Sequence, residues 1–541
     1  MEAVQIVVGL GGTGAKVIQS LVHLAAAGLV DGELDCVFVD QDGTNGNTTQ
    51  AEASATRYKS LVKTLRAGSL QPETRPETAA LRTPLSLGQN IYQPIDAMGA
   101  TLQTAFAVAE TPRKGDPGFD DAWLMRALFT QAERTVSMDN GFRARPAVGS
   151  AAYLRDAQLE GALWSRLSGS IKRCKRVGRR VNIVLVGSIF GGTGASGLPT
   201  LCEALRHFLD EEDKDRQQLR LGGVVMLPYF ESRPSDTQAG YVYGPADPGQ
   251  VHFALDHYKV LFQENWNNRL VDALYLIGLH EKCEVPYDPV GGGDGQRNPV
   301  LLPELLGALA VAHFCRNRDI GTGRVFYALH GRPDEVKVAD LPMPGAGEGR
   351  HLDRDRLFSL LRCAFVFVHA LAPLLDEIRA GREDIRDFPY LVNHLPRGLS
   401  EDERKLLGDL GDYLTELLQW AAALELWMPR GMNYDPLTAA RFADPARKHA
   451  IGAKLRFAKN RSDAASPDLK ADDLAVVKAA FDQLGTKERL ASLQQIIERL
   501  ADPAVPPRAG RGAGSKPLRS VERLFDALYR AAEIPLHQTE V

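Results

Sequence analysis

Up to about residue 330, the apolar positions form short continuous runs, and the stretches between them show helical spacing. Continuous apolar runs of this length are typical of strands that are buried on both faces. Because strands that alternate with helices form parallel sheets, we expect an α/β fold with helices on both faces of the sheet. The predicted strands are residues 4–9, 34–39, 181–186, 219–227, 273–278 and 325–329. The predicted helices are residues 15–27, 122–135, 153–171, 251–266 and 301–315.

The last part of the chain shows helical spacing almost throughout. A Gly/Pro-rich segment at 343–350 precedes a predicted helix at 352–371. A second such segment, at 503–517, is typical of a flexible linker, and it precedes a short last helix at 521–532. The predicted regions are an α/β domain at 1–284, a long apolar helix with its connecting segment at 285–375, and a mostly helical domain at 376–541.

The composition argues against several classes of function. A net charge of −4 over 541 residues gives no basic surface field, so nucleic acid is not an expected partner. The six cysteines form no CxxC pair, which is typical of a reduced protein and predicts no zinc site. No apolar run is long enough to span a bilayer, and the chain opens on a predicted strand instead of a signal peptide. We therefore expect a cytoplasmic protein without membrane contact.

Two strand–glycine-loop–helix units carry the candidate chemistry. In one, the strand at 4–9 leads into a loop at 11–14; in the other, the strand at 181–186 leads into a loop at 191–196. Glycine lets backbone N–H groups approach phosphate oxygens, and the following helix adds unpaired N–H groups and a partial positive charge. We expect both loops to contact one phosphorylated ligand. The expected contacts are Gly11, Gly12, Thr13, Gly14, Gly191, Gly192, Thr193, Gly194, Ala195 and Ser196.

Other interpretations of the first loop remain open. Its GxGxxG spacing also fits a dinucleotide-binding unit, with Asp40 after the second strand as the ribose acid, or a tight turn without a ligand. Neither loop is a Walker A motif, because Lys16 does not occupy the lysine position of that motif. A dinucleotide-dependent oxidoreductase is disfavoured, since it would leave the second glycine loop unexplained.

At this point the chain resembles the tubulin/FtsZ superfamily. GGTGASG at 191–197 is similar to the tubulin signature GGGTGSG, which FtsZ shares in related form, and GLGGTGAK resembles the first phosphate loop. FVDQDGTN at 38–45 resembles the tubulin segment FVDLEPT, and LRLGGVVMLPYF at 219–230 lies where that family has its next strand. The resemblance covers roughly residues 1–370 and indicates a divergent bacterial tubulin-like protein.

Three departures from the family pattern stand out. Phe190 replaces the first glycine of the signature, and a long insertion separates the second strand from the signature. The last third of the chain shows helical spacing, whereas the corresponding part of a tubulin begins with a mixed α/β domain. We therefore expect a parallel-sheet, tubulin-like nucleotide-binding domain followed by a mostly helical C-terminal region.

The resemblance implies a GTP site with Mg²⁺. The two glycine loops would hold the phosphates, with the hydroxyls of Thr193 and Ser196 as additional donors. Asp40 and Asp42 match the acidic positions of the tubulin segment near Mg²⁺ or the ribose, and Asp42 is the expected metal ligand. The alternative for Asp40 is a role at the strand end or in a turn.

Further ligand contacts are expected outside the glycine loops. Arg143 and Arg145 suit a γ-phosphate, because guanidinium groups bind phosphate with two donors; the alternative is a solvated loop. Asn298 and Glu304 lie near the start of the long apolar helix, where the resemblance places the guanine base. The alternatives for these two residues are helix capping and a surface charge.

In polymerising tubulins, acids in a loop after the long helix complete the active site of the next subunit. The best match is the segment 351–356 ahead of an apolar helix, with Asp353 and Asp355 as catalytic acids that orient or deprotonate water. Asp319 and Asp340 are rivals, and an N-cap role is the alternative for Asp353.

Two function hypotheses remain close to each other. The first is a GTPase that self-assembles in a nucleotide-dependent way into a filament or oligomer. The second is a nucleotide-bound scaffold or switch that binds a partner protein through its helical C-terminal region without polymerising. Both expect GTP and GDP as ligands.

Overall fold

A computed structural model describes most of the chain up to residue 435 and one later helix. The described residues are 3–68, 80–88, 91–96, 98–111, 113–115, 118–142, 145–213, 218–233, 248–264, 270–279, 282–286, 293–317, 324–329, 335–337, 341–345, 348–382, 384–387, 391, 395, 399–426, 433–435 and 520–532. They divide into two compact units. Unit 1 comprises Met1–Leu21, Asp31–Ala55 and Leu85–Pro333, and unit 2 comprises Val22–Val30, Thr56–Pro84 and Asp334–Val541.

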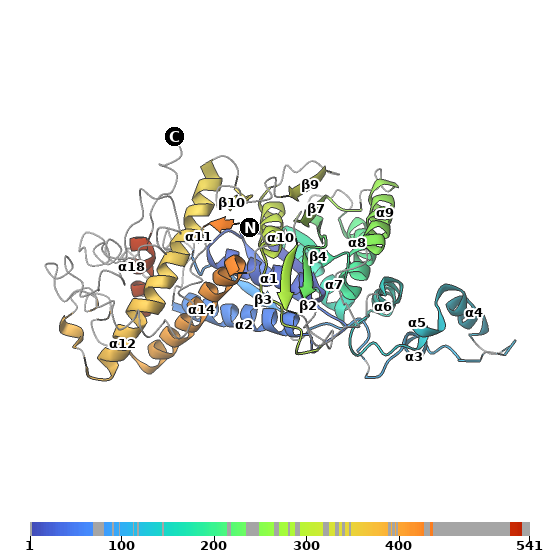
Figure 1. The fold of residues 1–541 in the computed structure, drawn as a ribbon, viewed down its shortest axis with the longest axis horizontal. Coiled ribbons are helices and arrows are strands. Elements are labelled where there is room, and N and C mark those ends of the chain that lie inside the picture. Colours follow the sequence, from blue (N-terminus) through green and yellow to red (C-terminus); the bar gives the residue numbers. More distant parts are fainter. Residues whose placement is uncertain are drawn as a thin grey trace. The chain divides into compact units, whose positions relative to one another are not determined.

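Unit 1 is built on a seven-stranded sheet in which every neighbouring pair of strands is parallel. The strand order is β3-β2-β1-β4-β5-β7-β9 (Figure 1). The strands are β1 (Val4–Leu10), β2 (Glu33–Val39), β3 (Leu85–Leu87), β4 (Val181–Ser188), β5 (Leu219–Met226), β7 (Ala273–Gly278) and β9 (Arg324–Leu329). A separate parallel pair joins β6 (Phe230–Arg233) to β8 (Cys283–Pro286). The expected α/β parallel sheet is therefore confirmed.

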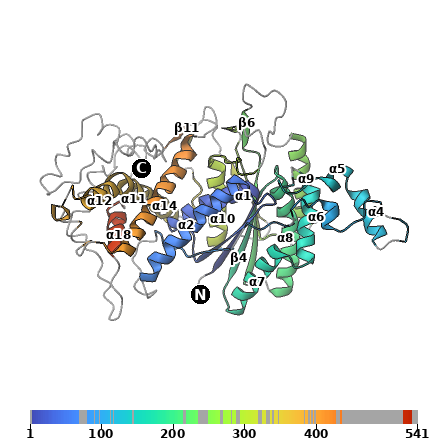
Figure 2. The same ribbon diagram turned by 90° about the horizontal axis from the view of Figure 1, so that it is seen from below.

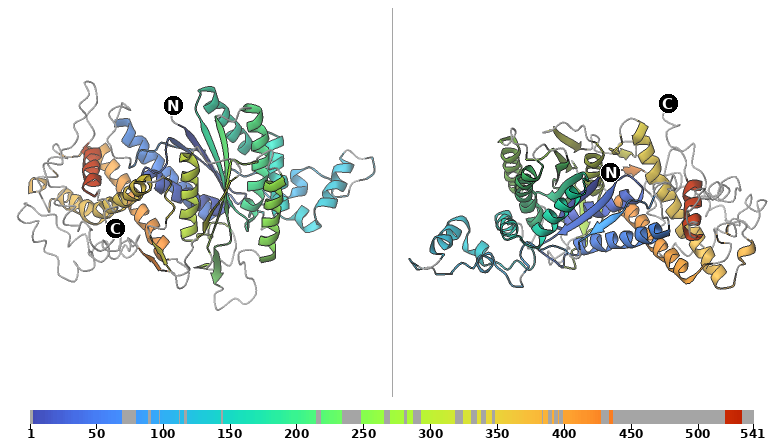
Figure 3. Two further views of the ribbon diagram at one scale, coloured as in Figure 1. Left: turned by 90° about the horizontal axis from the view of Figure 1, so that it is seen from above. Right: turned by 180° about the vertical axis from the view of Figure 1, so that it is seen from behind.

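Helices cover both faces of this sheet. The helices α1 (Gly11–Ala26) and α10 (Leu302–Arg316) lie on one face, and α7 (Ala162–Arg176) and α8 (Gly192–Glu212) lie on the other (Figure 2). Figure 3 shows the same two layers from above and from behind. Further helices that start in unit 1 include α2 (Gly46–Gly68), α6 (Pro146–Gln158) and α9 (Pro248–Glu264). On the first face, Gly307 of α10 packs so closely on Val17 of α1 that an added Cβ would lie 3.1 Å from it.

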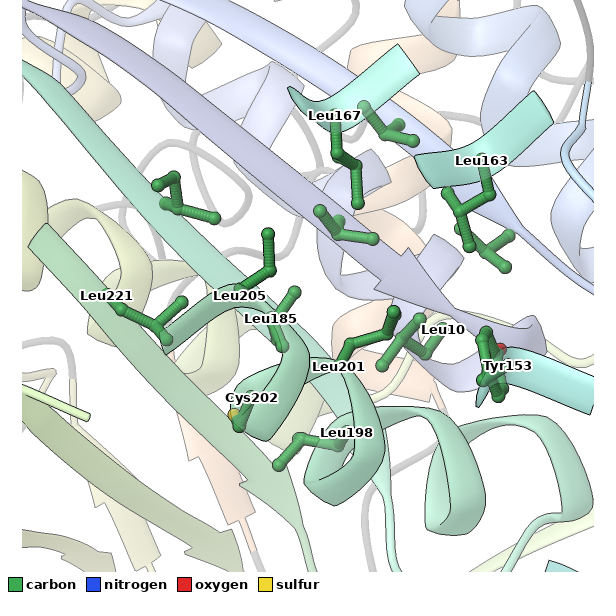
Figure 4. Close-up of a cluster of buried hydrophobic side chains, with 14 of the residues drawn as sticks. Leu10, Tyr153, Leu163, Leu167, Leu185, Leu198, Leu201, Cys202, Leu205 and Leu221 are labelled. Atoms are coloured by element: carbon green, nitrogen blue, oxygen red, sulfur yellow. The ribbon is translucent and has the colours of Figure 1, made fainter. Parts of the chain in front are cut away.

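A leucine-rich core joins α8 to the other face of the sheet. Leu198, Leu201 and Leu205 of α8 are fully or almost fully buried and lie over Leu185 of β4 (Figure 4). Because β1 and β4 are central strands with no exposed residue, their apolar runs have no polar alternation. The helices on both faces therefore fix where the loops at the strand ends lie.

Two predicted helices are each divided in two. The segment expected at 153–171 forms α6 (Pro146–Gln158) and α7 (Ala162–Arg176). The segment expected at 122–135 forms α4 (Phe119–Leu128) and α5 (Gln131–Thr135), which follow the short α3 (Leu102–Ala105). Thr130 begins a new helix because its hydroxyl accepts the Glu133 N–H, while the Glu133 carboxylate accepts the Thr130 N–H. This capping box interrupts the helical pattern that the apolar spacing suggests.

The described part of unit 2 is mostly helical. Its helices are α11 (Glu348–Val366), which continues into the π-helical η3 (Phe367–Leu371), then α12 (Ala372–Arg379), the 3₁₀ turn η4 (Ile385–Asp387), α14 (Glu401–Leu426) and α18 (Ser520–Ala532). One short parallel pair joins β10 (Glu335–Lys337) to β11 (Asn433–Asp435). The predicted linker at 503–517 lies outside the described residues.

An aromatic cluster packs inside unit 2. His23 is fully buried, its Nδ1 lies 3.1 Å from the Tyr413 hydroxyl, and its ring lies 5.0 Å from that of Trp420. Burial lowers the pKa of His23 to about 4, so the ring is neutral at physiological pH.

The two compact units are not continuous along the sequence, because unit 2 also includes Val22–Val30 and Thr56–Pro84. The helix α10 packs on the sheet and β9 pairs with β7, and both elements belong to unit 1. The regions expected at 1–284, 285–375 and 376–541 stay a prediction. Among the described helices, none has the length and apolar character needed to cross a membrane.

Candidate functional site

The two glycine loops lie at the carboxyl ends of neighbouring strands. Strand order reverses between β1 and β4, since β2 and β3 lie on one side of this pair and β5, β7 and β9 on the other. In open α/β sheets, ligands bind outside the carboxyl ends of the strands at such a switch point. The first glycine loop (residues 11–14) touches the second (residues 191–196), because a Cβ on Gly11 would lie 3.3 Å from the Thr193 Cβ. Sequence reasoning paired these loops, and the fold brings them together.

Two of the glycines serve close packing. A Cβ on Gly14 would lie 2.5 Å from the Val186 carbonyl oxygen, and one on Gly194 would lie 2.7 Å from the Ser188 N atom. A side chain at either position would push helix and strand apart. Gly11 has a φ of +71°, which an L side chain rarely adopts.

The remaining loop residues are the accessible ones. Gly12, Thr13, Gly191 and Gly192 are half-buried, and each belongs to the first turn of a helix or to the residue before it. N–H groups at this position have no partner within the helix and carry the positive end of its dipole. These residues therefore form the part of the site best suited to an anion.

The hydroxyls expected to assist are already engaged. Thr193 Oγ1 donates to Asp40 Oδ1 at 3.1 Å, and Ser196 Oγ donates to the Gly192 carbonyl at 2.7 Å. Ala195 is buried within α8. In this conformation the second loop can offer a ligand its backbone N–H groups but not these two hydroxyls.

Asp40 joins the segment after β2 to the second glycine loop. Its Oδ2 accepts the Thr48 hydroxyl at 3.0 Å, and its Oδ1 accepts the hydroxyl of Thr193 and the N–H of Asp42. Burial raises the pKa of Asp40 to about 7, although the two hydroxyl donors oppose the shift. Asp40 is thus a buried link between elements, which favours the turn alternative over direct ribose contact.

Asp42 fixes a turn and a distant loop. Its Oδ1 accepts the Thr44 N–H at 3.1 Å and the Thr44 hydroxyl at 2.8 Å, and its Oδ2 accepts the Gly293 N–H at 2.7 Å. Every carboxylate oxygen of Asp40 and Asp42 therefore already accepts a protein donor. No cluster of three metal-binding side chains occurs in the described ranges, and Asp42 as a ligand of Mg²⁺ stays a prediction.

Three further bonds hold the segment 293–298 against the residues after β2. Gly46 N donates to the Gly293 carbonyl at 3.0 Å, and Asn45 Nδ2 donates to Gln296 Oε1 at 2.7 Å. Asn298 N donates to Asn47 Oδ1 at 2.7 Å. Because a Cβ on Gly12 would lie 3.2 Å from Asn45 and Asn47, these hydrogen bonds lie beside the first glycine loop.

Glu304 belongs to a buried network and not to the surface. Its Oε1 accepts the Tyr229 hydroxyl at 2.7 Å and lies 3.4 Å from Lys16 Nζ, while its Oε2 accepts the Leu301 N–H at 2.7 Å. This last bond is the helix cap that was one alternative, whereas the surface-charge alternative is wrong because Glu304 is 1% exposed. Both oxygens have protein partners, and contact of Glu304 with a guanine base stays a prediction.

Lys16 is the counter-charge that sequence reasoning set aside. Its ammonium donates to the carbonyls of Asn298 and Pro299 and pairs with Glu304, and the side chain is 3% exposed. Burial lowers the pKa of Lys16 and raises that of Glu304, and the attraction between the two charges opposes both shifts. The one sequence signal was a lysine in a helix that contains no other Lys, Arg, Asp or Glu.

One of the two arginines expected at a γ-phosphate lies among the described residues. Arg145 is half-buried at the start of α6, and the loop before it lies close to the site, since a Cβ on Gly141 would lie 3.7 Å from the Asp42 Cβ. Arg143 lies outside the described residues. Their role at a γ-phosphate stays a prediction.

The expected catalytic loop is a helix. Residues 351–356 lie within α11, which begins at Glu348, so the helix expected at 352–371 is confirmed and the comparison of 351–356 with a catalytic loop is wrong. Asp353 is 1% exposed, accepts the Gly345 N–H at 2.9 Å and lies 3.6 Å from Arg356 Nη1; Asp355 is half-buried on the same helix. The rivals Asp319 and Asp340 lie outside the described residues.

The candidate site thus has two layers. Glycine N–H groups form the accessible layer, and buried side chains from β2–α2, α1, α10 and the β5–β6 connection support it. Sequence reasoning gave no role to Tyr229, Asn45, Asn47 and Gln296, although Asn45 and Tyr229 lie in segments that it compared with tubulin. Comparison of the chain with protein-family models and with curated proteins found no match.

Proposed function

We propose that unit 1 binds the phosphates of a nucleotide between its two glycine loops. The observation that carries this proposal is the contact of Gly11 with Thr193 at the point where strand order reverses. Two helix N-termini, α1 and α8, start at this point, and their first-turn N–H groups suit two or more phosphate groups of one ligand.

The nucleotide we propose is GTP, and the protein a divergent relative of tubulin and FtsZ. Support comes from the resemblance of the second loop to the tubulin signature and from the segment 38–45 after β2. The order β3-β2-β1-β4-β5 also occurs in dinucleotide-binding folds, so preference for GTP over NAD is part of the test.

Affinity titration of the full-length protein with GTP, GDP, ATP and NAD tests this proposal. Gly192→Val should abolish binding by placing a side chain where phosphate approaches. Gly169→Val is a matched control, since a Cβ on Gly169 in α7 would have no neighbour within 4 Å, and it should bind like wild type. Unchanged affinity in Gly192→Val, or a preference for NAD, would refute the proposal.

We further propose that hydrolysis depends on self-association, as the family resemblance implies. An active site shared between copies makes phosphate release per molecule rise with protein concentration. Mixing an Asp353→Ala variant with Gly192→Val should then recover part of the activity, because one mixed contact contains both intact halves. Activity that stays flat over a hundred-fold dilution, about 2.7 kcal/mol of mass action, would argue against this.

A second candidate is a nucleotide-bound switch that recruits a partner protein without hydrolysis. The observation that favours it is the burial of Asp353 in α11, where its carboxylate already accepts the Gly345 N–H. Sedimentation with GTP, with GDP and with a slowly hydrolysed analogue separates the candidates. GTP binding without phosphate release or sedimentation at any concentration would favour the switch.

A further inference from the structure

The first glycine loop is connected to the start of α10 by a chain of buried polar groups. Thr13 lies close enough to the Tyr229 hydroxyl to lower its pKa, and the Tyr229 hydroxyl donates to Glu304 Oε1 at 2.7 Å. Glu304 in turn pairs with Lys16, which lies two residues after the loop on α1. We propose that Tyr229, Glu304 and Lys16 are positioning residues that hold the first glycine loop in the conformation that binds phosphate, an inference that rests on the proposed function.

Tyr229 is the member of the network that approaches the first glycine loop from outside α1 and α10. It lies in the connection between β5 and β6, is 1% exposed, and contacts Phe190 and Phe230 with rings 5.9 and 5.2 Å away. The aromatic packing fixes the ring, so the hydroxyl has a defined position. Burial raises the pKa of Tyr229, which keeps the hydroxyl protonated and able to donate to Glu304.

Glu304 and Lys16 complete the support from the other side. Glu304 also caps α10 through the Leu301 N–H, so its carboxylate cannot rotate freely. Lys16 binds this carboxylate and the carbonyls of Asn298 and Pro299. The series of polar groups therefore begins at Thr13 and ends at Lys16, and both residues belong to α1. A buried network in which each member has partners is rigid, because any displacement leaves a polar group unpaired.

None of these three side chains is needed to contact the ligand. Thr13 is half-buried at the accessible layer, whereas Tyr229, Glu304 and Lys16 lie behind it. Their effect on phosphate binding is therefore exerted through the backbone of residues 11–14. Loss of the network should loosen the first turn of α1 even when no ligand is present.

The test uses Tyr229→Phe, which removes only the hydroxyl, with Tyr275→Phe as the matched control. Tyr275 also places its hydroxyl against α10, 2.8 Å from His313 Nδ1, but at the opposite end of that helix. Hydrogen exchange in the ligand-free, full-length proteins is followed at the amides of Ala15, Lys16 and Val17. In an α-helix these amides bond to carbonyls one turn earlier, which here belong to the first glycine loop.

We expect exchange at these amides to be several-fold faster in Tyr229→Phe than in wild type and unchanged in Tyr275→Phe. We also expect GTP affinity about tenfold weaker in Tyr229→Phe alone, the effect of one lost hydrogen bond. Equal exchange in the three proteins would overturn the inference, as would equal acceleration in both variants. A wild type that binds no GTP would instead refute the proposed function, while the exchange data would still decide whether the network positions the loop.

Discussion

The first glycine loop rests on charged and hydroxyl groups, whereas the second rests on one carboxyl group and an apolar core. Beneath the first lie Lys16, Glu304 and Tyr229, whose polar atoms are paired with one another. Beneath the second, Asp40 accepts the Thr193 hydroxyl, and the next turns of α8 carry buried leucines. Similar glycine motifs are therefore supported in different ways.

This difference separates what the loops offer a ligand from what holds them. In both loops the accessible groups are backbone N–H donors, so their chemistry toward phosphate is the same. The two supports are sensitive to different substitutions. Removal of one partner of a buried ion pair leaves the other charge uncompensated, whereas apolar packing is weakened by changes in side-chain volume. The following substitutions test that difference.

The largest effect is expected for Lys16→Met. Removal of the lysine leaves the Glu304 carboxylate buried without its counter-charge, which should lower the free energy of unfolding by about 3–5 kcal/mol. Urea denaturation measures this, and Lys16→Met combined with Glu304→Gln should recover most of the loss. A cost below about 1 kcal/mol for the single variant would show that the pair is not what holds the first loop.

The next effect concerns pH and the second loop. Burial raises the pKa of Asp40 to about 7, so between about pH 4 and 7 the folded protein keeps a proton that the unfolded chain has released. Stability should therefore fall as pH rises through this window, by at most about 1.4 kcal/mol per pH unit, and level off above it. Asp40→Asn should lack this slope.

Melting temperatures of the ligand-free wild type and Asp40→Asn, compared across that window, provide the measurement. His23 contributes a slope of opposite sign, because its pKa is lowered to about 4 and stability is lost as pH falls below its ordinary value. Both proteins contain His23, so the difference between them isolates Asp40. Parallel curves would mean that Asp40 is ionised throughout.

A smaller effect distinguishes two glycines of the second loop. Gly194→Ala should cost about 2 kcal/mol, since its Cβ would lie 2.7 Å from the Ser188 N atom and 2.9 Å from the Ser188 carbonyl oxygen. Gly191→Ala is the matched control: its Cβ would meet only Ser188 Oγ at 3.1 Å, and its cost should stay within about 0.5 kcal/mol. Equal costs by chemical denaturation would remove the distinction between packing and accessible glycines.

The smallest effect is expected for Ser196→Ala. The hydroxyl donates to carbonyls of its own helix, so its loss should cost about 0.5–1 kcal/mol and leave GTP affinity unchanged. Thr13→Val, which removes the hydroxyl that reaches Tyr229, should weaken GTP binding instead. Weaker binding in Ser196→Ala would indicate that its hydroxyl turns toward the ligand.

Strands were the most predictable part of this fold. The runs that became β1, β2, β4, β5, β7 and β9 were found within two residues of their ends, because strands buried on both faces need continuous apolar sequence. The helix α2 was missed because its sequence is mostly polar, and β3 because it has three residues. For both, tertiary contacts outweigh the local pattern.

By itself, the sequence determined the parallel α/β fold and the two glycine loops at strand ends, because continuous apolar runs mark strands buried on both faces and glycine acts through local backbone geometry. Only the tertiary structure decided which polar groups meet: Lys16 with Glu304, Asp40 with Thr193, and Asp42 with Gly293. It also buried Asp353 and gave its carboxylate the Gly345 N–H as a partner. Such pairs join residues that are distant along the chain, and a buried charge or hydroxyl takes whichever partner the packing of helices and strands brings within reach.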